Sequence, residues 1–478
     1  IVLPQGDMVF PVTDLLARAQ RQFDIAQILL EENLDALIAR GVLIRVDRPF
    51  DGVCRPECYW AEKTIAQRLV ALMVHPSLVR GRAGSQRSVE RHLTGNQAHA
   101  VAMAFESPVL IITGGPGTGK TTIIKEIVLG CMDRDLAVAV VAPTGRAAKR
   151  IEESSGYAAS TIHRLLKIDP ESGRFVHHEG NPLDFEMVVI DEFSMVDAFL
   201  FAALLKAVRP GAHMVLIGDK DQLPSVGPGN VIRDLIGSAV IPISFLTHNF
   251  RQEEAAPLLY LADCIQAGRE DLFLRACRRE HEQFSFFRAD SETRAQEIVL
   301  AQMESLSDRI PVGSLEYQVL SPMYRGEAGV EMLNRLIQNR FNPRELVCET
   351  SARQYRLGDR VMQLRNNYQL EIFNGEQGNV CGYDEQRKML KIDFGERTVE
   401  LSRDQIDDIV LSYASTVHKA QGAEFQEIIL CLLPQYGIML NRELFYTALT
   451  RARRRVVLVG SEEALAQAIR QTMPQLRK

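Results

Sequence analysis

The sequence predicts an α/β fold with two parallel-sheet domains, a small helical module ahead of them and a small antiparallel barrel inserted into the second. Short apolar runs bounded by turn residues alternate with helical patterns, as buried parallel strands do. They form an early set, "PVLIITGG", "AVAVVAP", "MVVIDE" and "HMVLIGD", and a late set, "YQVLSPM", "EIILCLL" and "RRVVLVG". Between the late runs, short alternating strands with Asn-Gly and Phe-Gly turns indicate antiparallel structure.

Length and composition fit a globular protein of several domains. The 478 residues are enough for about three domains of roughly 150 residues. The 46% hydrophobic and 24% charged residues are ordinary, and no apolar run is long enough to span a bilayer. The chain begins at Ile1 rather than Met, which indicates a fragment or a processed product. The net charge of −6 disfavours a general polyanion binder but allows a locally basic groove.

The eight cysteines do not form a disulfide framework, which favours reduced, mostly buried thiols in a cytoplasmic protein. Cys54 and Cys58 are the one close pair. A zinc site would need a second pair or nearby histidines at ligand spacing, and none follows in the sequence.

Residues 1–76 show apolar side chains at helical spacing, then a β-rich piece and a further helix. Two helices and a short hairpin predict a winged-helix-like module, which either binds DNA or serves as a scaffold. Residues 77–92, "SLVRGRAGSQRSVERH", have the composition of a linker.

The two sets of strands define the remaining boundaries. We expect the first sheet domain at 93–242 and the second at 243–345 and 412–478, with the barrel insert at 346–411. An insert of this kind is usually a functional attachment.

A phosphate-binding loop follows the first strand of the early set. The segment "GGPGTGKTT" fits G-x-x-x-x-G-K-T between a strand and a helix, a strong signal of NTP binding. Lys120 should reach the β- and γ-phosphates, and Thr121 should ligate Mg²⁺. The predicted nucleotide-binding residues of this loop are Gly115, Pro116, Gly117, Thr118, Gly119, Lys120, Thr121 and Thr122.

Two carboxylates end the strand "MVVIDE". Asp191 is expected to hold Mg²⁺ through its water shell, and Glu192 to take a proton from the attacking water. The alternative is a solvated loop start, which fits poorly after a phosphate-binding loop. Together with the loop, the pair indicates an NTPase that uses ATP and Mg²⁺.

The remaining motifs resemble those of superfamily 1 helicases. "GDKDQLPSVGPGNV" resembles motif III with Gln222, "LTHNFRQ" resembles motif IV with Arg251, and "FYTALTRARRRVVLVG" resembles motif VI with Arg451. "LTGNQAHAV" resembles the adenine-reading Q motif with Gln97, and "VVAPTGRAAKRI" and "STIHRLL" resemble motifs Ia and Ib. Together they cover about three quarters of the chain, and the resemblance is strongest to the stand-alone bacterial RecD-like enzymes.

The resemblance implies two RecA-like domains, a winged-helix-like module, a β-hairpin pin and an SH3-like barrel. It also implies ATP-driven 5′→3′ movement on single-stranded DNA and duplex unwinding, in repair or recombination. Arg251 and Arg451 would approach the γ-phosphate from the second domain, and arginine fingers raise the rate about a thousandfold or more. The alternative for each arginine is a surface ion pair.

The segment "TVHKAQGAEF" resembles motif V and is expected to face two ways. By resemblance, Thr416 and His418 would touch the DNA strand. Gln421, Gly422 and Glu424 would approach the nucleotide, with Glu424 at the ribose.

Further DNA contacts are implied elsewhere. They come from Thr144 and His163 in the first domain and from Asn367 and Tyr368 in the barrel insert, since strand binding needs phosphate donors and planar groups. Phe373 offers aromatic reach there or belongs to the barrel core.

The interval 167–182, "KIDPESGRFVHHEGNP", corresponds to the pin of the family. Its Ser-Gly turn predicts a hairpin, on which Phe175 and His177 would present planar faces to a base pair at the duplex junction. The alternative is an ordinary surface hairpin.

Several functional alternatives stay open. The chain is either a stand-alone enzyme or the RecD subunit of a multisubunit helicase-nuclease. The helix-hairpin-helix elements that usually precede the module in that family are absent from this sequence, which indicates either a truncated chain or a shorter branch, and we find no nuclease motif. A nucleotide-switched interaction protein would lack the catalytic Glu or the arginine fingers, which are present, and an RNA helicase is a third possibility.

The expected partners are single-stranded DNA and junctions of single and double strands, with a single-strand-binding protein or recombination subunits as protein candidates. We expect no membrane, a monomer, and a bacterial cytoplasmic, nucleoid-associated location.

Overall fold

The computed structural model describes most of the chain. The predicted sites Arg251 and Tyr368 and most of the 77–92 segment lie outside the described residues, and of 252–256 only the backbone is described. The described residues are 7–47, 50–79, 93–169, 172–247, 252–279, 281–350, 353–367, 369–395 and 397–473. Within them, no helix is both long and apolar enough to cross a bilayer.

The N-terminal module has the expected order of helix, helix and hairpin. Its three-stranded antiparallel sheet is ordered β1-β3-β2. The elements are β1 (Phe10–Pro11), α1 (Val12–Phe23), α2 (Gln27–Ala39), β2 (Ile44–Val46), β3 (Gly52–Cys54) and α3 (Pro56–Val74).

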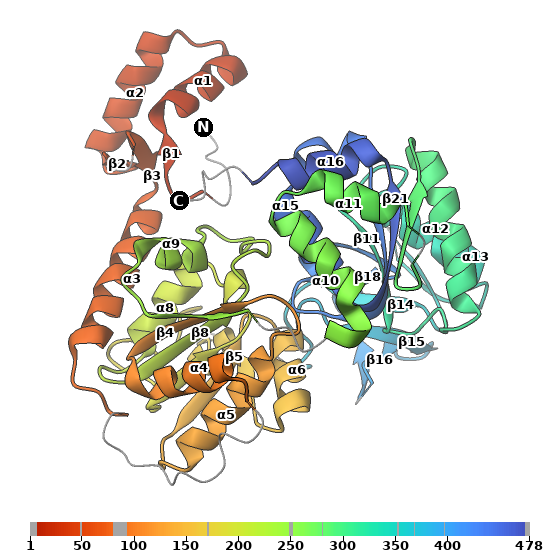
Figure 1. Cartoon of the computed structure of the whole chain (residues 1–478). Helices are drawn as coiled ribbons and strands as arrows, with labels where there is room; N and C mark the ends of the chain where they lie inside the picture. Colours follow the sequence, from red (N-terminus) through yellow and green to blue (C-terminus); the bar gives the residue numbers. More distant parts are fainter. Residues whose placement is uncertain are drawn as a thin grey trace.

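Helix α3 joins the module to the first sheet domain. It begins with Pro56 in its first turn, where a missing N–H costs nothing. Its buried side chains Ile65, Leu69 and Leu72 share one core with Phe201 and Leu205 of α8 (Ala198–Ala207). Figure 1 shows α3 running alongside α8. Module and first domain are thus continuous through a hydrophobic core.

Cys54 and Cys58 lie in this shared core. Both thiols are buried, and burial raises the pKa of Cys54 to about 11. Within the described residues, no cluster of three or more His, Cys, Asp or Glu side chains could hold a metal ion.

The first sheet domain has a parallel sheet ordered β6-β5-β7-β8-β4-β9. Its central strands are buried along their length, as expected for a sheet with helices on both faces. The strands are β4 (Val109–Gly114), β5 (Val138–Ala142), β6 (Ser160–Thr161), β7 (Met187–Ile190), β8 (His213–Gly218) and β9 (Ile243–Leu246). Strand β9 pairs with β4, although it lies beyond residue 242, the expected end of this domain. The expected boundary is too early because the short sequence of β9 does not indicate which strand it pairs with.

The first three helices of the first domain are α4 (Gly95–Glu106), α5 (Lys120–Met132) and α6 (Gly145–Ser155). The others are α7 (Ile162–Leu166), α8 and α9 (Val231–Ser238).

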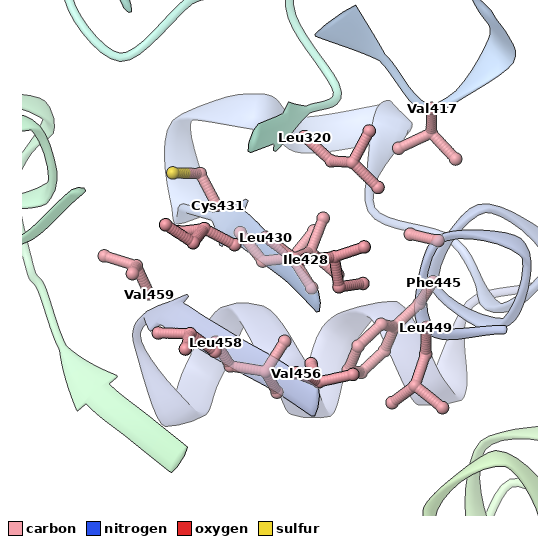
Figure 2. Close-up of a cluster of buried hydrophobic side chains, with 14 of the residues drawn as sticks. Leu320, Val417, Ile428, Leu430, Cys431, Phe445, Leu449, Val456, Leu458 and Val459 are labelled. Atoms are coloured by element: carbon pink, nitrogen blue, oxygen red, sulfur yellow. The ribbon is translucent and has the colours of Figure 1, made fainter. Parts of the chain in front are cut away.

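The second sheet domain is also parallel, with the order β10-β21-β20-β11-β19. Its strands are β10 (Phe284–Arg288), β11 (Tyr317–Ser321), β19 (Ala414–Thr416), β20 (Phe425–Leu432) and β21 (Ala452–Gly460). Its helices are α10 (Gln252–Gln266), α11 (Glu270–Cys277), α12 (Glu292–Ser307), α13 (Val330–Phe341), α15 (Arg442–Leu449) and α16 (Glu462–Arg470). Figure 2 shows the core between β20, β21 and α15, where Leu430, Leu458 and Phe445 are buried together.

The insert between α13 and β19 is antiparallel, as expected. One sheet is ordered β17-β16-β15-β14-β18, and β12 pairs with β13. Its elements are β12 (Leu346–Glu349), β13 (Gln354–Arg356), β14 (Arg360–Gln363), β15 (Gln377–Asp384), β16 (Met389–Asp393), β17 (Thr398–Leu401), α14 (Arg403–Ile406) and β18 (Ile409–Leu411).

The insert also touches the first domain through Phe373. A β-carbon added to Gly145, the first residue of α6, would lie 2.8 Å from the Phe373 ring, so this close approach requires glycine. Arg164 of α7 forms an ion pair of 3.4 Å with Glu371 of the same loop. Phe373 therefore lies at a contact between domains and is not part of the buried barrel core.

The interval 167–182 contains a short hairpin. The N–H of Val176 donates to Lys167 O, and Gly173 has a positive φ of 67° at the turn. Phe175 packs against the core of the first domain, with its ring 5.9 Å from the ring of His163. His177 is half-buried, with Nδ1 3.3 Å from Asn181 O. The contacts of Phe175 are those of an ordinary surface hairpin, and its role at a duplex junction stays a prediction.

Candidate active site between the two sheet domains

The phosphate-binding loop joins β4 to α5. Gly117 and Gly119 have φ values of 75° and 82°, which glycine adopts without strain. Lys120 Nζ donates to Gly114 O at 2.7 Å and to Gly115 O at 2.9 Å, so the ammonium lies inside the loop. With the N-terminus of α5 behind it, this loop can bind a polyphosphate.

Gln97 on α4 supports the same loop. Its Nε2 donates to Thr118 O at 3.1 Å, and its Oε1 accepts from the N–H of Thr94, the N-cap of α4. The side chain is 3% exposed. A second hydrogen on Nε2 and a second lone pair on Oε1 leave capacity for a base. Reading of adenine by Gln97 stays a prediction.

The two carboxylates end strand β7 inside the cleft. Asp191 and Glu192 are buried, and Asp191 Oδ1 accepts from the N–H of Glu192 at 2.9 Å. Burial, and then the charge of Glu192, raise the pKa of Asp191 to about 6. Glu192 has a positive φ of 50°, a backbone state that a non-glycine residue adopts rarely and mostly at functional sites.

These residues fit a divalent cation. Two adjacent buried carboxylates repel each other, and a bound cation would neutralise them. The Asp191 carboxylate and the Thr121 hydroxyl, at the start of α5, are hard oxygen donors of the kind that Mg²⁺ prefers.

The loop after β8 connects the two domains. Asp219 accepts a hydrogen bond of 3.0 Å from the Tyr446 hydroxyl of α15, and burial raises the pKa of Asp219. Gln222 Nε2 donates to Asp219 at 3.3 Å, while its buried Oε1 has no hydrogen-bond partner among the described residues. A buried acceptor without a partner can accept a hydrogen bond from a donor such as water.

Leu223 is hydrogen-bonded on both sides by the second domain. Its N–H donates to Thr447 Oγ1 at 2.7 Å, and its carbonyl accepts from Gln421 Nε2 at 3.0 Å. The predicted nucleotide residue Gln421 therefore contacts the loop that carries Gln222.

Arg451 follows α15 and is 2% exposed. Its guanidinium donates to Thr447 O and Ala423 O, each at 3.1 Å. It forms no ion pair with a described carboxylate, so the surface-pair alternative is not what the structure contains. Its role as an arginine finger stays a prediction.

The segment after β19 faces the start of α6. A β-carbon at Gly422 would lie 3.3 Å from Thr144 Oγ1, and Thr144 caps α6 by accepting from Ala147 N–H. Glu424 is paired with Arg453 at 2.7 Å and with Arg150 of α6 at 3.5 Å. Its expected contact with a ribose stays a prediction.

The remaining predicted DNA-contacting residues in the described part of the chain are Thr416, His418, His163 and Asn367. Thr416 lines a cavity of about 870 Å³ together with Lys419 and Arg353. His418 begins a 3₁₀ turn and is half-buried. Burial lowers the pKa of His163, which favours a neutral ring near pH 7. Asn367 Oδ1 accepts from Leu370 N–H within a turn of the insert.

Three residues that form contacts between the domains were not identified by sequence reasoning: Arg146, Arg150 and Tyr446. The two arginines lie four residues apart on α6, a spacing that puts both on one helix face, but their partners are distant in the chain. Arg146 lies 5.0 Å from the centre of the Phe425 ring of the second domain. Tyr446 has no local signal, because its partner Asp219 is 227 residues away.

The fold and site define a P-loop NTPase with two RecA-like domains and an inserted barrel. Residues 97–228 match the family profile described as AAA domain, 333–394 the ATP-dependent RecD-like DNA helicase SH3 domain, and 411–459 the UvrD-like helicase C-terminal domain. The chain is 33% identical to the RecBCD enzyme subunit RecD of Mycolicibacterium smegmatis over an alignment of 409 residues that covers 78% of this chain and 72% of the relative. The chain belongs to the RecD helicase family.

A second relative is the ATP-dependent RecD2 DNA helicase of Deinococcus radiodurans. It is 35% identical over 414 residues, which are 86% of this chain and 55% of the relative, so the chain spans about half of that protein's length. Among solved structures, Bacteroides Pif1 bound to ssDNA has a TM-score of 0.50 at 21% identity and covers 80% of this chain and 94% of its own. This likeness supports the fold.

Proposed function

We propose that the chain is an ATP-dependent DNA helicase that translocates 5′→3′ on single-stranded DNA and unwinds duplex in repair or recombination. One observation carries the proposal. The phosphate-binding loop and two buried carboxylates of the first domain face residues of the second, and Leu223 is bonded by both Thr447 and Gln421 across the cleft. Chemistry in such a cleft depends on how the two domains sit.

The proposed roles in ATP hydrolysis follow the geometry. Lys120 would bind the phosphates, Thr121 and Asp191 would hold Mg²⁺, and Glu192 would accept the proton of the attacking water. Gln222 would contact the γ-phosphate. Arg451 would stabilise the developing charge, as would Arg251, which lies outside the described residues.

The proposed DNA strand passes over the starts of α6 and α7 and over β19. Thr144, His163, Thr416 and His418 would contact it, with Asn367 reaching from the insert. The direction of movement rests on the family, since no contact in the site fixes it. A bacterial cytoplasmic location is part of the same proposal.

The test is unwinding of forked DNA that carries only a 5′ tail or only a 3′ tail, with Lys120→Ala as the control. We expect unwinding from the 5′ tail alone and none in the variant. Equal unwinding from both tails, or activity that survives Lys120→Ala, would contradict the proposal. ATPase stimulated by RNA but not by DNA would favour an RNA helicase instead.

A second candidate is the RecD subunit of a multisubunit helicase-nuclease. The similarity to the RecBCD enzyme subunit RecD of M. smegmatis favours it. Unwinding by the isolated chain would support the stand-alone enzyme, whereas activity only in the presence of recombination subunits would support the subunit.

A further inference from the structure

Four side chains of alternating charge form a row across the cleft, which we call the charge row: Glu192, Arg150, Glu424 and Arg453. Arg150 Nη1 lies 3.9 Å from Glu192 Oε1 and 3.5 Å from Glu424 Oε1. Glu424 Oε2 in turn accepts from Arg453 Nε at 2.7 Å. Arg150 is thus shared between the predicted catalytic carboxylate and a carboxylate of the second domain.

Three of the four side chains of the charge row are largely shielded from water, whereas that of Arg453 is 47% exposed. The side chains of Glu192 and Glu424 are 7% and 10% exposed, and that of Arg150 is 28% exposed. Ion pairs are screened less in such surroundings than at a surface, so small changes in these distances have large effects.

Helix α6 presents two arginines to the second domain and the insert. Arg146, one turn before Arg150, lies over the Phe425 ring and donates to Gln377 Oε1 of the insert at 3.4 Å. Because residues four apart share a helix face, both guanidiniums contact residues outside the first domain. Separation of the domains would therefore take Glu424 away from Arg150 while leaving Glu192 beside it.

We propose that Arg150 is a positioning residue for ATP hydrolysis, which holds the Glu192 carboxylate and is itself held by Glu424 when the cleft is closed. This inference rests on the proposed function. With Glu424 withdrawn, Arg150 loses its partner in the second domain and no longer fixes the position of the Glu192 carboxylate. With Glu424 in place, Arg150 is held from both sides and keeps the Glu192 carboxylate oriented.

The inference gives Glu424 a role different from ribose binding. A ribose contact would make Glu424→Gln raise the Kd for ATP. Membership of the charge row makes the same substitution lower kcat and leave the Kd nearly unchanged, because the interaction acts on the chemical step.

The experiment measures kcat of the DNA-stimulated ATPase and the Kd of a fluorescent ATP analogue for Arg150→Ala, Glu424→Gln and the double variant. We expect each single variant to lower kcat about tenfold or more with a Kd within about twofold of the parent. The double variant should be no slower than Arg150→Ala, because the two residues act on one carboxylate. Arg150→Lys should recover part of kcat.

The matched control is Arg209→Ala. Arg209 also bridges two carboxylates of the first domain, Asp184 and Glu186, each at 2.6 Å, but at the opposite end of β7. The substitution Arg209→Ala should leave kcat unchanged. Circular dichroism establishes that each variant is folded.

Three results would overturn the inference: a kcat of Arg150→Ala within about twofold of the parent, additive losses in the double variant, or an equal loss in Arg209→Ala. If the parent chain itself hydrolyses no ATP, the proposed function fails instead, so the two failures are distinguishable.

Discussion

Single residues of the segment 416–424 divide between two surfaces. Thr416 lines the cavity that also holds Lys419, whereas Gln421 reaches across the cleft to Leu223 O. His418 lies between them, half-buried, at the start of a 3₁₀ turn. This short turn links the side proposed to contact DNA to the side proposed to contact the nucleotide.

We predict that His418→Ala lowers the DNA-stimulated ATPase by about tenfold and the basal ATPase by about twofold or less. The reason is that the histidine would contact the strand and not the nucleotide. Steady-state ATPase with and without oligo-dT measures both quantities. His281→Ala, an exposed histidine of the same domain, is the control and should change neither. Equal losses in both activities would contradict this division of roles.

Strand β14 of the insert carries an unusual buried cation. Arg360 is 0% exposed and donates to Ser314 O, Tyr317 O, Gln318 Oε1 and Gln377 Oε1. Burial lowers the pKa of its guanidinium, and it forms no ion pair with a described carboxylate. It fastens the insert to β11 of the second domain through neutral acceptors.

We therefore predict that Arg360→Ala lowers the free energy of unfolding by about 3 kcal/mol, because several buried acceptors lose their donor at once. Arg365→Ala is the matched control in the same insert. Its side chain is 81% exposed and lies 3.6 Å from Asp408, so Arg365→Ala should lower the free energy of unfolding by less than about 0.5 kcal/mol. Urea denaturation monitored by circular dichroism compares them, and equal effects would disprove the role of Arg360.

Some elements of the fold can be predicted from the sequence, and others cannot. Buried parallel strands and the phosphate-binding loop are visible locally, because runs of Val and Ile and the glycine spacing belong to a single segment. The edge strand β9 and the Phe373 contact with Gly145 are not, because each depends on a partner far away in the chain. Arg150 was missed for the same reason: nothing within α6 indicates that Glu424 will meet it.

The whole molecule buries almost all of its thiols. All eight cysteines lie in the described part, and Cys381 is the one that is exposed. Burial raises the pKa of Cys131 and of Cys431 to about 12, so these groups stay protonated at neutral pH.

We predict that a thiol reagent such as DTNB at pH 8 modifies one thiol per native chain quickly and all eight after unfolding. Cys381→Ser should remove the fast reaction. Rapid modification of several thiols in the native protein would show that the cysteines of the domain cores are not buried as described here.

The core that α3 shares with α8 has a mechanical consequence. Because Ile65, Leu69 and Leu72 pack into this core, α3 is a rigid connection between the module and the first domain and not a flexible linker. Any ligand bound by the N-terminal module would therefore move together with the first sheet domain.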